Sequence, residues 1–453
     1  MAKYDFPKGI ESVEELPKTR RHLTNCFNDG NGSLVQRPGI TQLAITSKVA
    51  RGQFKWNDSL YQVVSQSLIK ITNLATGAFS VIGTVAGSDD IRVAIGFVNA
   101  VIVVKNGAIY TLDTSDVLVD ISGNANMVSC VDVCHINSRF VYVPADGSPA
   151  FFSDIGAAGT IDALSFFDAE ELPDKNTTCF VIKSTLYIGG ADSFELFRDT
   201  GAVPNPFTRV TGARIQNGFI GGLLQYADTY LFIGNEIDQD SGIYAIGSGK
   251  AEKISNHAVD KILTDHTPTE LSQAIASRFK WRGYDVAAFT LRGASLGFIG
   301  GNWFELETFI GGISRNWGGG FITEIENKYY TAKDDKIGVL ADVNTDYGDA
   351  LTREILVAFT QDDGEYISCQ SVSLGLSQGF NANAGSVAIQ LSRDGVTFGD
   401  PLYRDVGALG EYNSRLTWRY AGGLGTYENF IAIRITTTEN INFSCDSLSV
   451  ILS

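Results

Sequence analysis

The sequence lacks the features that would mark a membrane or secreted protein. No stretch reaches the ~18 consecutive apolar residues of a membrane span, and the first residues lack the apolar core of a signal peptide. The six cysteines include no Cys-x-x-Cys pair, so we expect buried free thiols made in a reducing compartment. They are Cys26, Cys130, Cys134, Cys179, Cys369 and Cys445.

Positive charge and histidine are also scarce. The chain has 35 Lys and Arg against 51 Asp and Glu, a net charge of −16. Sequence-reading DNA binding draws its affinity from Lys and Arg on phosphates, so this composition argues against it. The four histidines are not spaced as ligands, so a zinc site is not expected. They are His22, His135, His257 and His266.

Glycine and aromatic residues are abundant. There are 48 Gly, 27 Phe and 17 Tyr but only 2 Met, which favours strands and turns over helices. The 453 residues exceed one ordinary core, so we expect two or three domains, or one large repeat domain with a smaller one.

The segment Val98 to Leu112 shows the repeating unit. Two β-branched runs flank Lys105-Asn106-Gly107, and Asn-Gly between such runs predicts a tight hairpin. Similar strands follow seven polar pivots at roughly 45-residue intervals, which is typical of propeller blades. The pivots are Asn57, Asn99, Asn137, Ser184, Asp228, Arg282 and Asn327.

We therefore predict an all-β fold with a β-propeller over residues 51–345. Seven pivots indicate seven blades, or six if the first or last hairpin belongs elsewhere. The four strands of the first blade are expected near Leu60–Val64, Ser67–Ile71, Phe79–Val85 and Ile91–Gly96. A β-sandwich array with similar hairpin spacing remains an alternative.

One pivot spacing is longer than the rest, and a predicted helix accounts for it. Thr267-Pro268-Thr269-Glu270 has the pattern of a capping box with Pro at the first helical position. The helix is expected over Pro268–Lys280, inserted between two blades.

Both ends of the chain differ from this repeat. Residues 1–50 are irregular, contain the basic cluster Arg20-Arg21-His22, and are expected to form an arm on the C-terminal domain or on a neighbouring subunit. An acidic link at Asp342–Thr352 precedes alternating strands, so residues 346–453 are predicted to be a β-sandwich. Its strands are expected at Glu354–Thr360, Val372–Leu376, Val387–Ser392, Leu416–Tyr420, Ile431–Thr436 and Ser447–Leu452.

Four short motifs resemble chemical signatures, and each has a plainer interpretation. Gly293–Gly297 fits Gly-x-Ser-x-Gly but lies in a predicted hairpin tip rather than a strand-to-helix elbow. Gly247-Ser248-Gly249-Lys250 is too short for a phosphate loop. Asn235–Gly242 is an acidic turn without the regular ligand spacing of a calcium loop. Ser392-Arg393-Asp394-Gly395 resembles the structural Asp-box turn of sialidases. We assign no catalytic, cofactor-binding or metal-ligating residue.

Ordered pieces over most of the chain resemble the packaged-DNA stabilisation proteins, or tail nozzle proteins, of short-tailed bacteriophages. The N-terminal pieces are Arg37-Pro38-Gly39-Ile40 and Arg51-Gly52. The middle pieces are Ile246–Ala251, Asp260-Lys261-Ile262 and Thr267–Lys280. The C-terminal pieces are Leu391-Ser392, Asp394-Gly395, Phe398-Gly399, Leu416, Trp418-Arg419 and Phe430-Ile431.

The resemblance implies a hexameric ring at the distal end of a short tail in the virion, assembled in the host cytoplasm. Above it would lie the portal and the adaptor ring, around it tailspikes or fibres, and below it a needle or plug. It would retain packaged double-stranded DNA and form the conduit for ejection, with no sequence-specific contact, no cofactor and no catalysis.

Two other functions remain open. One is a phage carbohydrate-binding or polysaccharide-degrading propeller, which would need an acid and nucleophile pair and an arginine cluster. The other is a generic propeller scaffold of a cell, which would stay monomeric even beside phage proteins.

Overall fold

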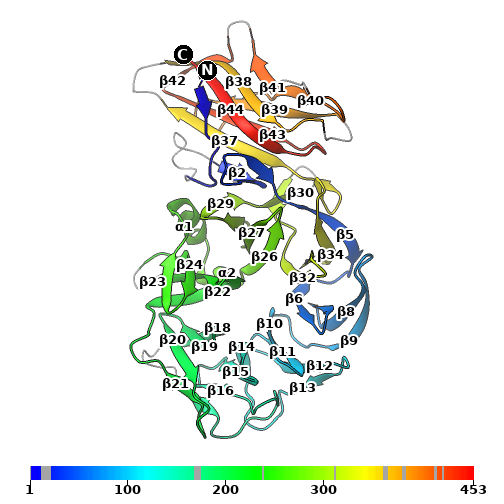
Figure 1. Ribbon diagram of the computed structural model, residues 1–453, viewed down its shortest axis with the longest axis vertical. Coiled ribbons are helices and arrows are strands. Elements are labelled where there is room, and N and C mark those ends of the chain that lie inside the picture. Colours follow the sequence, from blue (N-terminus) through cyan, green and yellow to red (C-terminus); the bar gives the residue numbers. More distant parts are fainter. Residues whose placement is uncertain are drawn as a thin grey trace.

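The structure is a computed structural model of the chain, and it describes residues 2–11, 22–167, 175–236, 239–310, 313–360, 366–379, 384–412, 416–420 and 423–453. A ring of small sheets carries a second β-domain at one end, and both chain termini lie at that second domain (Figure 1). Of the two helices in the described residues, neither has the length and apolarity to cross a bilayer.

The ring consists of seven four-stranded antiparallel blades within the described residues. Blade 1 contains β6 (Ala50–Trp56), β7 (Ser59–Val64), β8 (Ser67–Asn73) and β9 (Ala78–Thr84). Blade 2 contains β10 (Ile91–Ile95), β11 (Asn99–Val104), β12 (Ile109–Asp113) and β13 (Leu118–Asp120). Blade 3 contains β14 (Cys130–Ile136), β15 (Arg139–Pro144), β16 (Ala150–Phe152) and β17 (Phe166–Phe167). Blade 4 contains β18 (Asn176–Ile182), β19 (Thr185–Gly190), β20 (Phe194–Asp199) and β21 (Phe207–Arg209). Blade 5 contains β22 (Asn217–Tyr226), β23 (Thr229–Glu236), β24 (Gly242–Gly247) and β25 (Lys250–Lys253). Blade 6 contains β26 (Ile275–Trp281), β27 (Tyr284–Thr290), β28 (Ser295–Ile299) and β29 (Asn302–Glu305). Blade 7 contains β32 (Phe321–Ile325), β33 (Lys328–Lys333) and β34 (Lys336–Ala341), and its fourth strand is β5 (Gly39–Ile45) from the N-terminal segment.

Local turn chemistry explains why the pivots recur. Most of them occupy the tight turn between the first and second strands of a blade, where positive φ is required. Asn57 and Asp58 have φ of 44° and 52°, and Asn137 and Ser138 have φ of 46° and 65°. The hairpin predicted from Val98 to Leu112 is formed by β11 and β12, with Val101 opposite Thr111 and Asn106 at φ 60°.

Apolar contacts between facing sheets hold successive blades together. One buried cluster joins blades 1 and 2 and another joins blades 2 and 3. Phe180 of blade 4 stacks on Tyr230 of blade 5 at 4.6 Å between ring centroids, and Phe152 of blade 3 meets Phe207 of blade 4 at 5.3 Å. Because a lone blade would expose both faces, this stacking supplies the core.

Two details of the predicted propeller are wrong. The first blade begins one strand earlier than expected, at β6, so Ile91–Ile95 is the first strand of blade 2. The predicted helix does begin at Pro268, with Thr267 as its N-cap, but it ends at Leu271, and Ile275–Trp281 is a strand. The capping box forms, yet a second strand, β27, pairs with residues 275–281 and overrides their helical pattern.

A helix that we did not predict precedes it. α1 (His257–Thr264) is capped by Asn256, whose side chain accepts the Val259 N–H, and α2 (Pro268–Leu271) follows. The signal was present in the sequence, because Asn256 stands before the apolar residues Val259 and Leu263, which share one helical face.

The N-terminal segment passes through both domains. β1 (Ala2–Tyr4) and β4 (Leu34–Gln36) pair with β44 (Ser444–Leu452) of the second domain, and β3 (Cys26–Asn28) pairs with β4. β5 instead pairs with β34 and closes blade 7. The prediction that residues 1–50 leave the propeller is therefore wrong for β5, which ties the last blade to the start of the chain.

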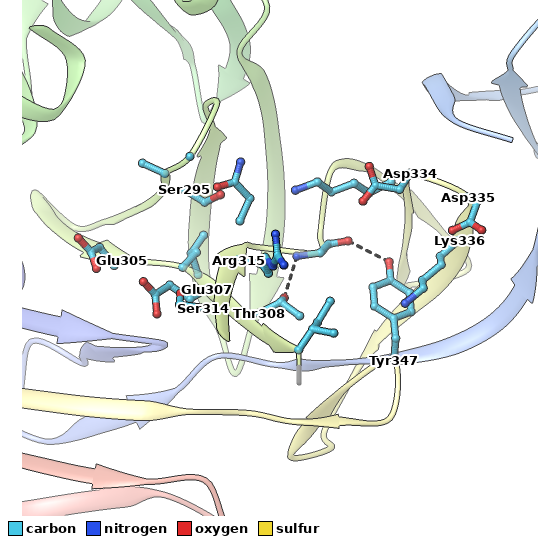
Figure 2. Close-up of a pocket in the computed structure, with 17 residues that line it drawn as sticks. Ser295, Glu305, Glu307, Thr308, Ser314, Arg315, Asp334, Asp335, Lys336 and Tyr347 are labelled. Atoms are coloured by element: carbon cyan, nitrogen blue, oxygen red, sulfur yellow. Dashed lines mark hydrogen bonds between the residues drawn. The ribbon is translucent and has the colours of Figure 1, made fainter. Parts of the chain in front are cut away.

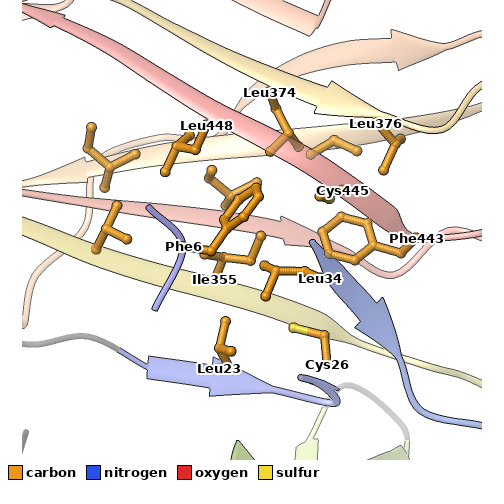
Figure 3. Packing of buried hydrophobic residues seen from close by; sticks show 14 of the residues in the cluster. Phe6, Leu23, Cys26, Leu34, Ile355, Leu374, Leu376, Phe443, Cys445 and Leu448 are labelled. Carbon is orange, nitrogen blue, oxygen red and sulfur yellow. The ribbon is translucent and has the colours of Figure 1, made fainter. Parts of the chain in front are cut away.

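The second domain is a β-sandwich, as predicted. One sheet contains β3, β4, β44, β38 (Tyr366–Leu376), β41 (Leu416–Arg419) and β42 (Gly425–Glu428), with β1 at its edge. The other contains β2 (His22–Thr24), β37 (Arg353–Thr360), β43 (Phe430–Thr437), β39 (Gly385–Ser392) and β40 (Leu402–Val406). Figure 3 shows the core between them, where Phe6, Leu23 and Leu34 of the N-terminal segment pack against Ile355 and Leu448.

β2 joins the two domains into one sheet. It lies parallel to β29 of blade 6 and antiparallel to β37 of the sandwich. The resulting nine-stranded sheet runs without a break from blade 6 into the sandwich. Backbone hydrogen bonds therefore fix the orientation of the sandwich on the propeller.

Candidate functional site at the domain junction

A buried ion pair lies where the N-terminal segment, the propeller and the sandwich meet. Arg37 donates two hydrogen bonds to Asp346, at 3.0 and 2.5 Å, and both side chains are 0% exposed. Nε of Arg37 also donates to Asn25 Oδ1 at 2.7 Å, and Nη2 donates to the Glu307 carbonyl at 2.7 Å. Asp346 accepts a further bond from Thr308 Oγ1 at 2.8 Å. These hydrogen bonds offset the cost of burying two charges.

The residues that follow Arg37 fit closely against the linker to the sandwich. A Cβ on Gly39 would lie 2.3 Å from the Val343 carbonyl oxygen, so only glycine fits there. The Ile40 carbonyl accepts the Tyr347 N–H at 2.8 Å. The Arg37-Pro38-Gly39-Ile40 motif is thus a structural element of the junction.

A cavity of about 750 Å³ opens beside this ion pair, between blades 6 and 7 and the hairpin of β30 (Glu307–Ile310) and β31 (Ile313–Asn316). Figure 2 shows Glu305 and Glu307 on one side and Asp334, Asp335 and Lys336 on the other. Tyr347, which also lines the cavity, donates its hydroxyl hydrogen to the Gly318 carbonyl at 2.9 Å.

The cavity carries charges of both signs in a partly buried setting. His22 Nε2 lies 2.8 Å from Glu305 Oε2, which ties one carboxylate to β2. Burial raises the pKa of Glu307, and the nearby Glu305 carboxylate raises it further. Burial lowers the pKa of Lys333, whose Nζ donates to the Trp317 carbonyl at 2.5 Å. The cavity can therefore hold a polar or charged group by hydrogen bonding.

Nucleophilic chemistry is not assembled around Ser295 in this cavity. The residue begins β28, is buried, and its Oγ accepts the Trp317 N–H at 3.2 Å. No histidine is among the described residues that line the cavity. The Gly293–Gly297 motif is a hairpin end, where Gly293 has φ of 92°.

The other sequence motifs are turns as well. Asp394 Oδ1 accepts the N–H groups of Val396 and Thr397 at 2.9 and 2.7 Å and the Ser392 hydroxyl at 2.8 Å. These donors hold the pKa of Asp394 well below its usual range. Ser248 and Gly249 form the β24–β25 turn at positive φ rather than a phosphate loop.

Two sequence features fall partly outside the described residues. In the acidic turn Asn235–Gly242, residues 237 and 238 are not described, and in the basic cluster only His22 is. No group of three or more potential metal-ligating side chains occurs in the described part of the chain. All six cysteines are buried as free thiols, and burial raises the pKa of Cys26 to about 12.

A second cavity, of about 640 Å³, lies on the propeller axis and is lined mainly by the first strands of the blades. Asp132 is buried at its side and accepts from Thr178 Oγ1 at 2.7 Å and from the Cys179 N–H at 3.1 Å, which ties blade 3 to blade 4. Burial raises the pKa of Asp132, and Arg92 opposes that rise. The volume is that of a small-molecule site.

Sequence reasoning did not bring Asp346, His22 and Glu305 together as a group, since His22 is 283 residues from Glu305 and Arg37 is 309 residues from Asp346. The only available signal was Arg37 itself, an arginine within a Pro-Gly turn motif. Arg51 of the next motif is likewise structural, because its guanidinium donates to the carbonyls of Ser65 and Val85 at 2.6 and 3.0 Å.

Two family models match the chain in order. One, described as bacteriophage P22 Gp10, beta-propeller, matches residues 8–341, and the other, described as bacteriophage P22 Gp10, beta-sandwich, matches residues 352–452. Among curated proteins, the chain is similar to tail hub protein gp10 of Salmonella phage P22. The two are 22% identical over 466 residues, covering 97% of this chain and 96% of that protein.

Two solved structures show a weaker likeness. A catalytically inactive virginiamycin B lyase from Staphylococcus aureus aligns with a TM-score of 0.44 at 10% identity, covering 67% of this chain and 98% of that one. BamB from Moraxella catarrhalis aligns with a TM-score of 0.39 at 14% identity, covering 75% and 96%. Neither TM-score is high enough to support an argument about this chain.

Proposed function

Because this chain belongs to the bacteriophage P22 Gp10 family and is a structural protein of the phage tail, we propose that six copies of it form the nozzle of a short tail. The ring would lie below the portal and adaptor rings, with tailspikes or fibres around it and a needle or plug at its outlet. It would retain packaged DNA and then conduct it outward.

One observation carries the proposal: the family match covers both domains in order, and the similarity to a tail hub protein extends over 97% of the chain. A scaffold that shared only the propeller would match over the ring alone. The two domains therefore belong to one inherited unit.

The size of the axial cavity favours a conduit between copies rather than through one copy. That cavity is of small-molecule size, and buried side chains such as Asp132 line it. Duplex DNA would pass through the centre of a ring of whole subunits. A net charge of −16 suits such a wall, since acidic groups offer no phosphate-binding wells in which DNA would stick.

The proposal is tested by measuring how many copies of the chain assemble on the adaptor ring. Full-length chain is mixed with purified adaptor ring, and the copies per complex are counted by native mass spectrometry. We expect six. A chain that remains monomeric beside the adaptor would contradict the nozzle and favour a generic scaffold.

A polysaccharide-degrading function is the second candidate, because the junction cavity holds Glu307, whose pKa is raised, near the carboxylate of Glu305. A raised carboxyl pKa is what a general acid requires. The test is release of reducing ends from host polysaccharide by the purified chain and by Glu307→Gln. Activity in the first that is lost in the second would favour a hydrolase over a purely structural protein.

A further inference from the structure

Among the described residues, the outer edge of blade 1 carries neither charge nor a covering strand. Edge strands are normally protected by charge, by short length or by a covering segment. β25 carries Lys250, Glu252 and Lys253, and β29 is covered by β2. β9 has seven residues, none of them charged, and among the described residues it pairs only with β8. No charged residue occurs from Thr72 to Ser88.

Apolar side chains project from this edge. Phe79 and Val81 alternate along β9, so they lie on the same face of the strand. They are 39% and 64% exposed. We call Phe79, Val81 and the uncharged β9 backbone the blade 1 ridge.

Blade 3, two blades further round the ring, carries a hollow. A groove of about 300 Å³ is lined mainly by apolar residues. These include Val128, Pro144, Pro149, Phe151, Ile161 and Phe166. Val128 and Phe166 remain 41% and 51% exposed. Asp162 is the only charged residue among the described residues lining it, and we call this feature the blade 3 groove.

The charge of the chain indicates what could cover both surfaces. Two copies that each carry −16 repel one another except where their facing surfaces lack charge. The ridge has none and the groove has one carboxylate. A ring needs a heterologous contact, in which two different patches of one chain complement each other.

We propose that the blade 1 ridge of one copy packs into the blade 3 groove of the next copy. This inference rests on the proposed ring and deepens it by naming the contact between subunits. Apolar burial supplies the attraction, and the two-blade separation lets each copy use both surfaces at once.

The test uses full-length Val81→Lys and Val128→Lys, with and without the adaptor ring, in sedimentation velocity over a concentration series. Each substitution would bury an unpaired ammonium in the contact, so we expect subunit association to weaken at least about tenfold. Val396→Lys is the matched control, because Val396 is 69% exposed on the sandwich, away from both surfaces. It should assemble as the unmodified chain does.

Mixing the two variants sharpens the result. Val81→Lys keeps its groove and Val128→Lys keeps its ridge, so an equal mixture should form pairs and nothing larger. Loss of assembly in Val81→Lys alone would indicate ridge-to-ridge pairing and overturn the proposal. Normal rings from both variants would overturn it while leaving the nozzle intact. An unmodified chain that never associates would overturn both.

Discussion

The contacts between blades and the contact between domains share apolar packing but differ in what is added to it. Successive blades meet through apolar clusters, such as the one that contains Val63 and Ile102. The propeller and the sandwich also share an apolar cluster, which contains Phe304 of blade 6 and Ile355 of the sandwich. To it they add a shared sheet and the buried Arg37–Asp346 pair. Apolar contact is non-directional and tolerates exchange of one apolar side chain for another of similar volume. A bidentate ion pair has a defined geometry, so at the junction it adds an orientational constraint that apolar packing alone does not supply.

The two kinds of contact should respond differently to substitution. A ring of stacked blades gains stability from many similar contacts, each contributing a little. The sandwich is connected through a single junction that contains a buried ion pair. Removing one partner of such a pair lowers the free energy of unfolding sharply, because the other charge stays buried without its partner. The junction is therefore where a single substitution should have the largest effect.

Breaking the ion pair should give the largest effect. Asp346→Asn leaves a buried guanidinium without its counter-charge and should lower the free energy of unfolding by roughly 3–5 kcal/mol. Urea denaturation followed by fluorescence should show one transition in the unmodified chain and two in the variant, since the domains would uncouple. The double variant Arg37→Met with Asp346→Leu should recover part of the loss. Unchanged stability in Asp346→Asn would mean that the shared sheet alone holds the domains.

Filling the space at Gly39 should come next. Gly39→Ala places a methyl group 2.3 Å from the Val343 carbonyl oxygen, and such overpacking costs about 1–3 kcal/mol. Gly123→Ala is the matched control, because a Cβ there meets nothing within 4 Å. Thermal unfolding should separate the two variants, and equal melting temperatures would show that the linker can move aside.

Removing the N-cap of α2 should cost less stability than breaking the ion pair at the junction, because the cap is a local contact of the propeller. Thr267 Oγ1 accepts the Glu270 N–H at 3.3 Å, and Glu270 in turn accepts the Thr267 N–H at 3.0 Å. Thr267→Ala should cost about 1 kcal/mol in urea denaturation, without uncoupling the domains. Thr269→Ala, in the same turn, is the control. A cost equal to that of Asp346→Asn would contradict the contrast between local and junction contacts.

The smallest expected effect is a pH dependence at the junction. The folded-state pKa of Glu307 is raised by burial, so its contribution to stability is complete below the ordinary glutamate value of about 4.3. That contribution is lost as pH rises through the folded pKa. Glu307→Gln should flatten the stability profile above that pH and leave the acid side unchanged. Identical profiles in thermal denaturation would show that solvent reaches this carboxyl freely.

Much of the architecture could be predicted from local pattern. The turns at Asn57, Asn137 and Asn327 require positive φ, and residues that adopt it readily mark them in the sequence. Counting these turns predicts seven blades, with six left open, and the described residues form seven. Most of the predicted sandwich strands lie within three residues of the observed ones, because alternation of polar and apolar side chains is also local. β38 begins six residues before the predicted Val372, and β40 and β42 were not predicted.

The misplaced elements share one cause. Residues 275–281 have a helical pattern, but pairing with β27 decides their state, and that pairing is tertiary. The same holds for β5, whose partner β34 lies almost 300 residues later. The candidate site could not be predicted for this reason: Arg37 and Asp346 have no local signal that joins them.

The sequence by itself determined the hairpins, their number and the two-domain order, because turn residues and strand alternation act over a few neighbouring positions. Only the tertiary structure decided where each blade begins, how the N-terminal segment threads both domains, and which charges meet at the junction. Those outcomes depend on long-range pairing and on burial, which remove water from Arg37 and Asp346 together and make their contact a fixed part of the fold.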